Sequence, residues 1–144
     1  MARFIQGYYT PKNPQKYVGD ITKIRYMSSW EHSVHRFLDN NTRVLRWSSE
    51  EIVIPYIKPT DGRVHKYYPD YWVEYVNADG EILQEILEVK PAQQTKPTKS
   101  RNPKHRLYEQ VTFAVNTAKW EQAILWCKQR NMKFRLITEN SIFS

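Results

Sequence analysis

The sequence has very little cysteine and no long hydrophobic run. Its single cysteine, Cys127, excludes an internal disulfide framework and a cysteine-rich zinc site, and fits a reducing compartment. No apolar stretch approaches the roughly 20 residues that a membrane-spanning helix needs, and the first residues lack the long apolar segment of a signal peptide. We therefore expect a protein of the cytoplasm with no membrane partner.

The composition is otherwise that of an ordinary globular chain. Of its 144 residues, 40% are hydrophobic, 14% aromatic and 26% charged, with too many aromatic residues for a disordered protein. A chain of this length is expected to form one domain with a substantial core. We predict this domain over residues 28–144. Residues 1–27, rich in tyrosine, proline, lysine and asparagine, are predicted to be an arm that packs on the domain or extends from it; the alternative is a passive tail.

Positive charge is concentrated in one segment. The chain has 22 lysine and arginine residues against 15 aspartate and glutamate residues, a net charge of +7. Residues 91–103 are polar, basic and too long for a simple connector, so they predict a binding loop for an anionic partner such as DNA. The basic residues expected to contact DNA phosphates, in this loop and just after it, are Lys96, Lys99, Arg101, Lys104 and Arg106.

Apolar spacing predicts two helices. The first covers residues 28–41, and its expected apolar face consists of Trp30, Val34, Phe37 and Leu38. After Pro103 the helical period returns, as one long helix or as two short helices with a break at 116–117. Trp120 and Cys127 lie on the apolar stripe of this second region and are expected in the core.

The segments rich in β-branched and aromatic residues predict strands. These segments are Val44–Trp47, Ile52–Ile57, Val64–Tyr75, Glu81–Lys90 and Phe134–Thr138. Turn residues at 60–62 and 77–80 predict hairpins. The resulting order αβββαβ, with a crossover helix before the last strand, predicts an α/β fold with a mixed sheet flanked by helices, in which the last strand can run parallel to a central one.

Two carboxylates and a lysine are predicted to meet on one hairpin. Glu88 and Lys90 are two residues apart in a strand, so both side chains project from the same face. Asp70, preceded by Pro69, lies on the strand that folds back against this one. Two carboxylates so placed suit Mg²⁺, and a lysine beside them can orient or deprotonate an attacking water or offset charge growing on a phosphate. The pattern predicts metal-assisted phosphodiester hydrolysis; the alternative is a solvated strand face with a cross-strand ion pair.

Glu31 allows two interpretations. Ser28 to Glu31 match a capping box, in which a glutamate at the third helical position reaches back to the start of the helix. The same carboxylate could instead face the sheet and complete the metal site. Glu50 and Glu51 are interpreted as turn or edge-strand charges, and the four histidines show no convincing metal-ligand spacing.

These residues resemble a known nuclease superfamily. Pro69 and Asp70 followed by Glu88-Val89-Lys90, behind a helix that carries Glu31, are similar to the PD-(D/E)xK superfamily, which includes restriction-endonuclease-like and TnsA-like nucleases. A more specific likeness, to the head completion nucleases of T4-like phages, covers nearly the whole chain. The segments that carry it are Thr10–Pro14, Lys16–Tyr17, Gly19–Asp20, Ser28–Glu31, Trp47–Glu51 and Tyr68–Trp72.

The resemblance implies a restriction-endonuclease-like αβββαβ core and a set of site residues. The implied catalytic residues are Glu31, Asp70, Glu88 and Lys90. Asp70 and Glu88 would be metal ligands, with the Val89 carbonyl as a third, and Mg²⁺ would be the cofactor, with Mn²⁺ as a substitute.

The resemblance also implies a function and partners. The chain would be a Mg²⁺-dependent DNA endonuclease of phage head completion, acting after DNA packaging, with phage capsid or portal and neck proteins as partners. It would work in the host cytoplasm during assembly or within the virion. Two alternatives stay open: a non-catalytic head completion protein that binds DNA or portal, and a junction or transposon-type endonuclease. The oligomeric state is not predicted.

Overall fold

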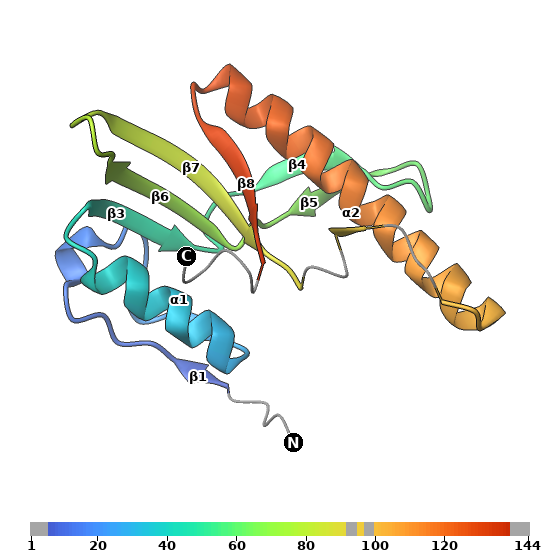
Figure 1. The fold of residues 1–144 in the computed structure, drawn as a ribbon, viewed down its shortest axis with the longest axis horizontal. Coiled ribbons are helices and arrows are strands. Elements are labelled where there is room, and N and C mark those ends of the chain that lie inside the picture. Colours follow the sequence, from blue (N-terminus) through green and yellow to red (C-terminus); the bar gives the residue numbers. More distant parts are fainter. Residues whose placement is uncertain (1–5, 92–94, 97–99, 139–144) are drawn as a thin grey trace.

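A four-stranded mixed sheet forms the centre of the fold in the computed structural model, which describes residues 6–91, 95–96 and 100–138 (Figure 1). Its order is β3 (Val44–Ser49), β6 (Tyr71–Val76), β7 (Ile82–Val89) and β8 (Lys133–Ile137). The first three strands are antiparallel, and β8 runs parallel to β7. The predicted mixed sheet and its parallel last strand are therefore confirmed.

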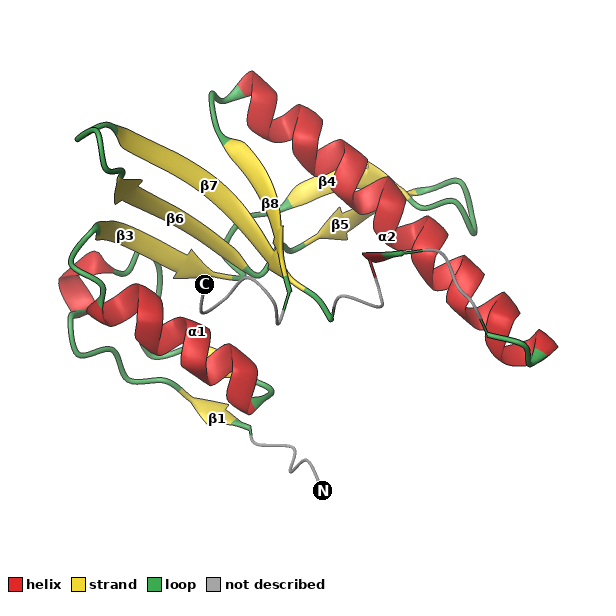
Figure 2. Cartoon of the chain, viewed as in Figure 1, coloured by secondary structure: helices red, strands yellow, loops and turns green. Residues whose placement is uncertain are grey.

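Strand alternation gives the sheet two buried faces. On one face Tyr71, Val73 and Leu87 pack against helix α1 (Ser29–Asn40) and the N-terminal arm. On the other face Trp72 and Ile86 pack with Cys127 of helix α2 (Pro103–Gln129). Because neighbouring residues of a strand point to opposite faces, each strand of the pair β6 and β7 contributes to both layers. Helix α1 thus packs on one face of the sheet, and helix α2 packs on the other (Figure 2).

Helix α2 also carries a separate hairpin. This hairpin consists of β4 (Ile54–Ile57) and β5 (Val64–Tyr67), which pair with each other outside the main sheet. Their buried side chains pack against Trp120 and Ala123 of α2. The hairpin crosses the helix and packs against it, and the N-terminal part of the helix extends beyond the sheet (Figure 1).

The arm of residues 6–27 is an ordered part of the molecule. It includes β1 (Gly7–Tyr8), the short 3₁₀-helix η1 (Pro14–Lys16) and β2 (Arg25–Tyr26). Tyr9 and Tyr17 are buried and pack edge-on against the fully buried Trp47 of β3. The described part of the arm therefore belongs to the main core, and the passive-tail alternative does not apply to it.

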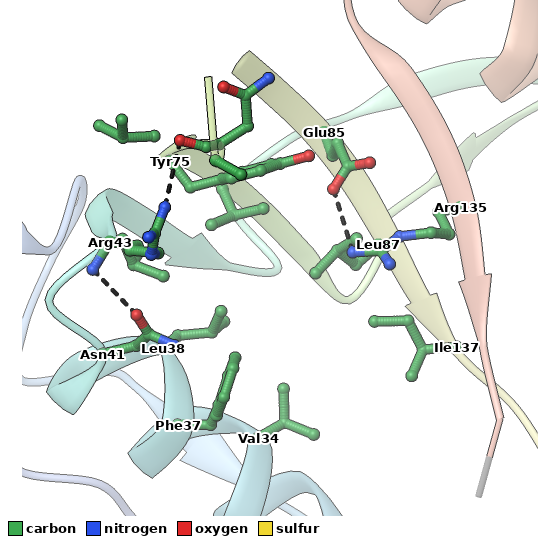
Figure 3. A pocket seen from close by; sticks show the side chains of 15 residues that line it. Val34, Phe37, Leu38, Asn41, Arg43, Tyr75, Glu85, Leu87, Arg135 and Ile137 are labelled. Carbon is green, nitrogen blue, oxygen red and sulfur yellow. Dashed lines mark hydrogen bonds and ion pairs between the residues drawn. The ribbon is translucent and has the colours of Figure 1, made fainter. Parts of the chain in front are cut away.

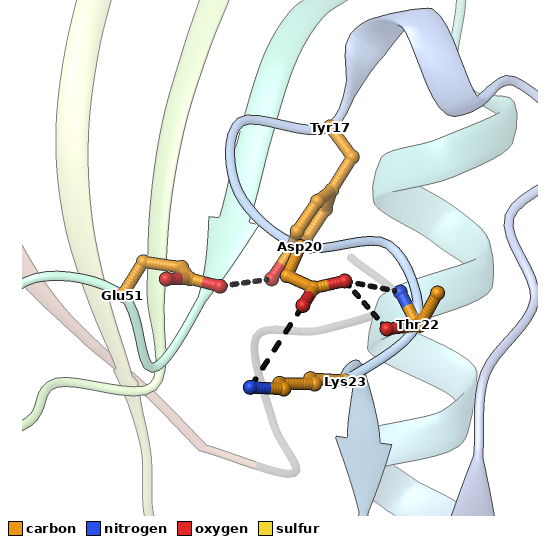
Figure 4. A network of polar contacts seen from close by, with 5 residues as sticks. All are labelled: Tyr17, Asp20, Thr22, Lys23 and Glu51. Atoms are coloured by element: carbon orange, nitrogen blue, oxygen red, sulfur yellow. Dashed lines mark hydrogen bonds and ion pairs between the residues drawn. The ribbon is translucent and has the colours of Figure 1, made fainter.

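Polar contacts also fix the arm to the end of β3 (Figure 4). The Tyr17 hydroxyl donates to Glu51 Oε1 at 3.3 Å and accepts from the Ser49 amide at 3.1 Å. Asp20 accepts from both the amide and the hydroxyl of Thr22, which closes the loop that follows. Between them, Gly19 has φ +140°, and a Cβ there would lie 2.5 Å from Glu51 Oε1. Only glycine fits this position without strain.

The structure differs from the sequence predictions in two details and decides between two alternatives in a third. Phe37, expected on the apolar face of α1, is 50% exposed. The segment predicted as one strand over 64–75 is divided into β5 and β6, in different sheets, around the buried Pro69. The region after Pro103 is one continuous helix without a break at 116–117. Within the described residues, no helix is long and apolar enough to cross a membrane.

Candidate active site

The sheet brings Asp70 and Glu88 side by side. Tyr71 of β6 pairs with Leu87 of β7, so Asp70 stands opposite Glu88 at the end of the hairpin. The Asp70 amide donates to Glu88 Oε1 at 3.2 Å, and the Val89 amide donates to Asp70 Oδ2 at 2.7 Å. Each carboxylate is thereby tied to the backbone of the opposite strand through one oxygen. This reciprocal pair of hydrogen bonds fixes both carboxylates against each other.

The two carboxylates resist ionisation together. Burial raises the pKa of Asp70 well above its usual range, and the negative charges of Glu88 and Glu31 raise it further, against the Val89 amide and Lys90. Burial likewise raises the pKa of Glu88, while Lys90 and the nearby Tyr67 hydroxyl oppose this effect. Two adjoining buried carboxylates repel each other unless a cation compensates them. Perturbed acids of this kind are typical of functional sites.

Lys90 occupies the position that the strand alternation predicts. It follows β7 directly, and its Nζ lies 3.9 Å from Glu88 Oε2. The side chain of Glu88 is only 7% exposed, whereas that of Lys90 is 29% exposed. The lysine therefore borders the carboxylate pair with a partly exposed side chain. The structure brings Asp70, Glu88 and Lys90 together as expected.

Glu31 acts as the helix cap in this structure. Its amide donates to Ser28 Oγ at 3.1 Å, and its Oε2 accepts from the Met27 amide at 2.5 Å. The N-cap is Ser28, so Glu31 reaches back to the start of the helix, but it binds the amide one residue before the N-cap and not the N-cap amide of a standard capping box. Its charge still reaches the site, because it raises the pKa values of both Asp70 and Glu50.

Glu50 lies directly after β3, in agreement with its interpretation as a turn or edge-strand charge. It has φ +56°, and its amide donates to the Asp70 carbonyl at 3.1 Å. Partial desolvation and the charge of Glu31 raise its pKa, and Arg25 opposes them. Glu50 is therefore a further acidic residue at the edge of the site, close enough to Glu31 for their charges to interact. The left-handed backbone at Glu50 could not be read from a residue type that rarely adopts it.

The residues present fit a magnesium ion by their donor chemistry. Within the described residues, no group of three or more histidine, cysteine, aspartate or glutamate side chains is close enough to hold a metal. Mg²⁺, however, is commonly held by one or two carboxylates together with water and substrate phosphate. Asp70 and Glu88 supply two such carboxylates in a site where a bound cation would relieve their repulsion. The Val89 carbonyl as a third ligand remains a prediction.

Two further residues near the pair were not found by sequence reasoning. The Tyr67 hydroxyl is buried and lies close enough to Glu88 to lower the pKa of that carboxyl. Lys119 of α2 lies within electrostatic range of both Glu88 and Lys90. Neither belongs to a local motif, since Tyr67 comes from the separate hairpin and Lys119 from the crossover helix. Only the tertiary fold brings them to the site.

The predicted DNA-binding residues lie along a different part of the molecule. Lys96 and Arg101 are exposed in the connection between β7 and α2. Lys104 and Arg106 are exposed in the first turns of α2, in the part that extends beyond the sheet (Figure 1). Lys99 lies outside the described residues. The structure thus places four of the five basic residues on a solvent-exposed path leading away from the carboxylates.

An apolar cavity lies on the opposite face of the sheet. It has a volume of about 340 Å³ and lies between α1 and the sheet (Figure 3). Leu87, Val73 and Ile137 line it, and these belong to the face opposite to Ile86. Arg135 and Glu85 close one side with a 3.1 Å ion pair. This cavity is therefore separate from the candidate active site.

Comparisons with known proteins agree with the geometry. The family model described as TnsA-like endonuclease N terminal matches residues 41–139. This segment contains Asp70, Glu88 and Lys90, but it begins after Glu31. The head completion nuclease of Enterobacteria phage T4 is 34% identical over an alignment 142 residues long, and the alignment covers 94% of this chain and 92% of that protein. No solved structure gives a significant match.

Proposed function

The chain belongs to the TnsA-like endonuclease N-terminal family, and we propose that it is a Mg²⁺-dependent endonuclease that hydrolyses phosphodiester bonds in DNA. The single observation that carries this proposal is the backbone-fixed pair of Asp70 and Glu88 with Lys90 beside it. A cross-strand ion pair on a solvated face would not need a second buried carboxylate.

In this proposal the three residues have distinct tasks. Asp70 and Glu88 would hold the metal, with the Val89 carbonyl as a further ligand. Bound Mg²⁺ would polarise a phosphate oxygen and make bound water more acidic, and Mn²⁺ would substitute for it. The Lys90 ammonium orients the attacking water or stabilises the charge that develops on the phosphate. Glu31 completes the acidic edge of the site while it caps α1.

The exposed basic residues extend this site toward a longer DNA substrate. Lys96, Arg101, Lys104 and Arg106, with Lys99, would contact phosphates and give an affinity that falls with salt. The sequence has no evident base-reading helix. The choice of cleavage site would therefore depend on the structure of the DNA or on its position. This supports a substrate recognised through its backbone.

The biological setting that we propose is phage head completion after DNA packaging. The support is the identity to the T4 head completion nuclease, which extends over nearly the full length of both chains. Capsid, portal or neck proteins would then be partners, and the protein would act in the host cytoplasm during assembly or in the virion.

Nicking of supercoiled plasmid tests the proposed activity. Wild-type protein is expected to nick DNA with Mg²⁺ or Mn²⁺ and not with EDTA. Asp70→Ala and Lys90→Ala should each lower the rate by at least about 100-fold, because each removes charge from the reacting centre. The exposed Asp79→Ala and Lys133→Ala serve as matched controls that keep the wild-type rate. No cutting by wild type, with DNA binding intact, would contradict the proposal and favour a non-catalytic binding protein.

A further inference from the structure

Lys119 of helix α2 is held in an unusual environment beside the carboxylate pair. Its Nζ lies 5.7 Å from the ring centre of Tyr56 and 5.6 Å from that of Tyr67. Both tyrosines are buried residues of the β4–β5 hairpin. Aromatic faces attract an ammonium group, so the two rings restrict where this flexible side chain can go.

The ammonium group has no anionic partner among the described residues. No carboxylate lies within ion-pairing distance of it, and it makes no hydrogen bond to the described part of the chain. Burial lowers the pKa of Lys119, the Glu88 carboxylate raises it, and the ammonium groups of Lys90 and Lys58 lower it. A half-buried cation that is not neutralised internally suggests an external anion.

Helix α2, which carries Lys119, lies on the same face of the sheet as the carboxylate pair. Glu88 shares its side of β7 with Ile86, and Ile86 packs with Cys127 of α2. The face of the sheet that carries the carboxylate pair is therefore the face that α2 covers. Tyr67 connects the two, since its ring contacts Lys119 and its buried hydroxyl lies near Glu88. Hairpin, helix and sheet thus meet around the pair.

We propose that Lys119 binds a phosphate of the DNA strand that occupies the active site. This inference rests on the proposed function and deepens it by naming a substrate contact. Lys58 and Lys90 both repel the Lys119 ammonium group, and a phosphodiester placed beside it would relieve this repulsion. The rings of Tyr56 and Tyr67 keep the ammonium available for phosphate without an internal ion pair. The DNA strand would therefore pass between the β4–β5 hairpin and the end of β7.

The competing explanation is a packing role, in which Lys119 only joins the hairpin to α2. Lys119→Met keeps most of the stem and removes the charge, whereas Lys119→Arg keeps the charge. Lys128→Met, at an exposed position of the same helix, is the matched control. The full chain is used, and the probe is a linear DNA duplex without divalent metal, so that affinity is measured without cleavage.

Three readouts separate the explanations: affinity as a function of salt, nicking rate with Mg²⁺, and melting temperature. We expect Lys119→Met to weaken binding roughly tenfold and to reduce the slope of log affinity against log salt by about 1, as one lost phosphate contact requires. It should also slow nicking, while Lys119→Arg and Lys128→Met stay near wild type. The melting temperature should change little in all three variants.

Two results would overturn the phosphate contact. One is wild-type affinity and salt slope in Lys119→Met. The other is a lower melting temperature that accompanies weaker binding in both Lys119→Met and Lys119→Arg, which would assign the residue to packing. If wild-type protein failed to nick DNA but Lys119→Met still lost affinity and salt slope, the endonuclease proposal would fail and the phosphate contact would stand.

Discussion

At the scale of single residues, the site holds two carboxylates side by side, and their repulsion destabilises the protein when no cation compensates it. Asp70 and Glu88 are fixed by backbone amides in positions that raise both pKa values. Such an arrangement is costly for folding and useful for binding a cation. Function and stability should therefore respond in opposite directions when one charge is removed.

Asp70→Asn tests this opposition. The variant keeps an acceptor for the Val89 amide and removes the repulsion with Glu88, so the metal-free protein should become more stable by about 1 kcal/mol. Thermal unfolding in EDTA measures the change, with Asp79→Asn as an exposed control. A variant that is markedly less stable than wild type without metal would contradict the repulsion.

His35 is a second buried ionisable residue, and its contacts define its tautomer. Its Nε2 lies 2.8 Å from the Arg25 carbonyl, which can only accept, so Nε2 carries the proton. Its Nδ1 lies 2.7 Å from the Tyr71 hydroxyl and accepts from it. Burial lowers the pKa of His35 to about 4, with a smaller opposing effect from the Arg25 carbonyl. The folded protein therefore holds this imidazole neutral.

The protein should lose stability on mild acidification through His35. Its pKa is about 4 when folded and about 6.5 when unfolded, so between these values the unfolded chain binds the extra proton. The contribution is complete above pH 6.5 and falls by roughly 3 kcal/mol as the pH drops to 4. Urea unfolding at several pH values should show this slope in wild type and a smaller one in His35→Gln. Equal slopes in both proteins would refute the assignment.

At the scale of elements, the arm and helix α1 stabilise each other through one buried aspartate. Asp39 is fully buried and accepts from the Tyr9 hydroxyl at 2.6 Å and from the amides of Lys12 and Asn13 at 2.7 and 3.0 Å. Lys16 Nζ donates to three carbonyls at the C-terminal end of α1. A helix end normally leaves such carbonyls unpaired, so the lysine also complements the helix dipole.

Asp39→Ala should detach the arm. It leaves three donors without an acceptor, and we expect a loss of at least about 3 kcal/mol in the free energy of unfolding. Limited proteolysis should then cut within residues 6–27 first. Asp79→Ala, in an exposed turn, should match wild type in both measurements. Resistance of the arm to protease in Asp39→Ala would show that other contacts suffice to hold it.

The elements themselves could largely be predicted from local pattern. The first helix, the hairpin turns and the last strand follow from apolar spacing and turn residues, and the structure confirms them. The sequence carries one signal for the division of 64–75 into β5 and β6, because Pro69 lies at the break and cannot donate to a strand ladder. The sequence does not show that the two halves belong to different sheets, because both have the same strand-forming composition. What separates them is the packing of β5 against α2, a tertiary contact.

At the scale of the whole molecule, the site divides into a local and a long-range part. Asp70, Glu88 and Lys90 could be predicted because one hairpin carries all three. Lys119 could not, since its approach depends on how the crossover helix and the β4–β5 hairpin pack. Glu31 lies at the start of α1 as its local sequence predicts, with its carboxylate on the Met27 amide, and its electrostatic effect on Asp70 appears only in the fold.

The positive charge of the molecule can also be divided into a part that the sequence predicts and a part that only the fold shows. The net charge of +7 predicts an anionic partner but not its path. In the fold, Lys96, Arg101, Lys104 and Arg106 are exposed in the connection to α2 and in its first turns, and a second group, Lys90 and Lys119, lies near Glu88. A DNA substrate would contact both groups. One group would then bind the DNA backbone, and the other would act where the DNA is cleaved.

Binding of Mn²⁺ followed by electron paramagnetic resonance tests the central claim most directly. The account predicts that wild-type protein binds Mn²⁺ at the carboxylate pair, that Mg²⁺ competes for it, and that Asp70→Asn and Glu88→Gln each lose this binding while the exposed control Asp79→Asn retains it. Equal Mn²⁺ binding by wild type and both site variants, or none by wild type, would contradict the claim that Asp70 and Glu88 form a metal site.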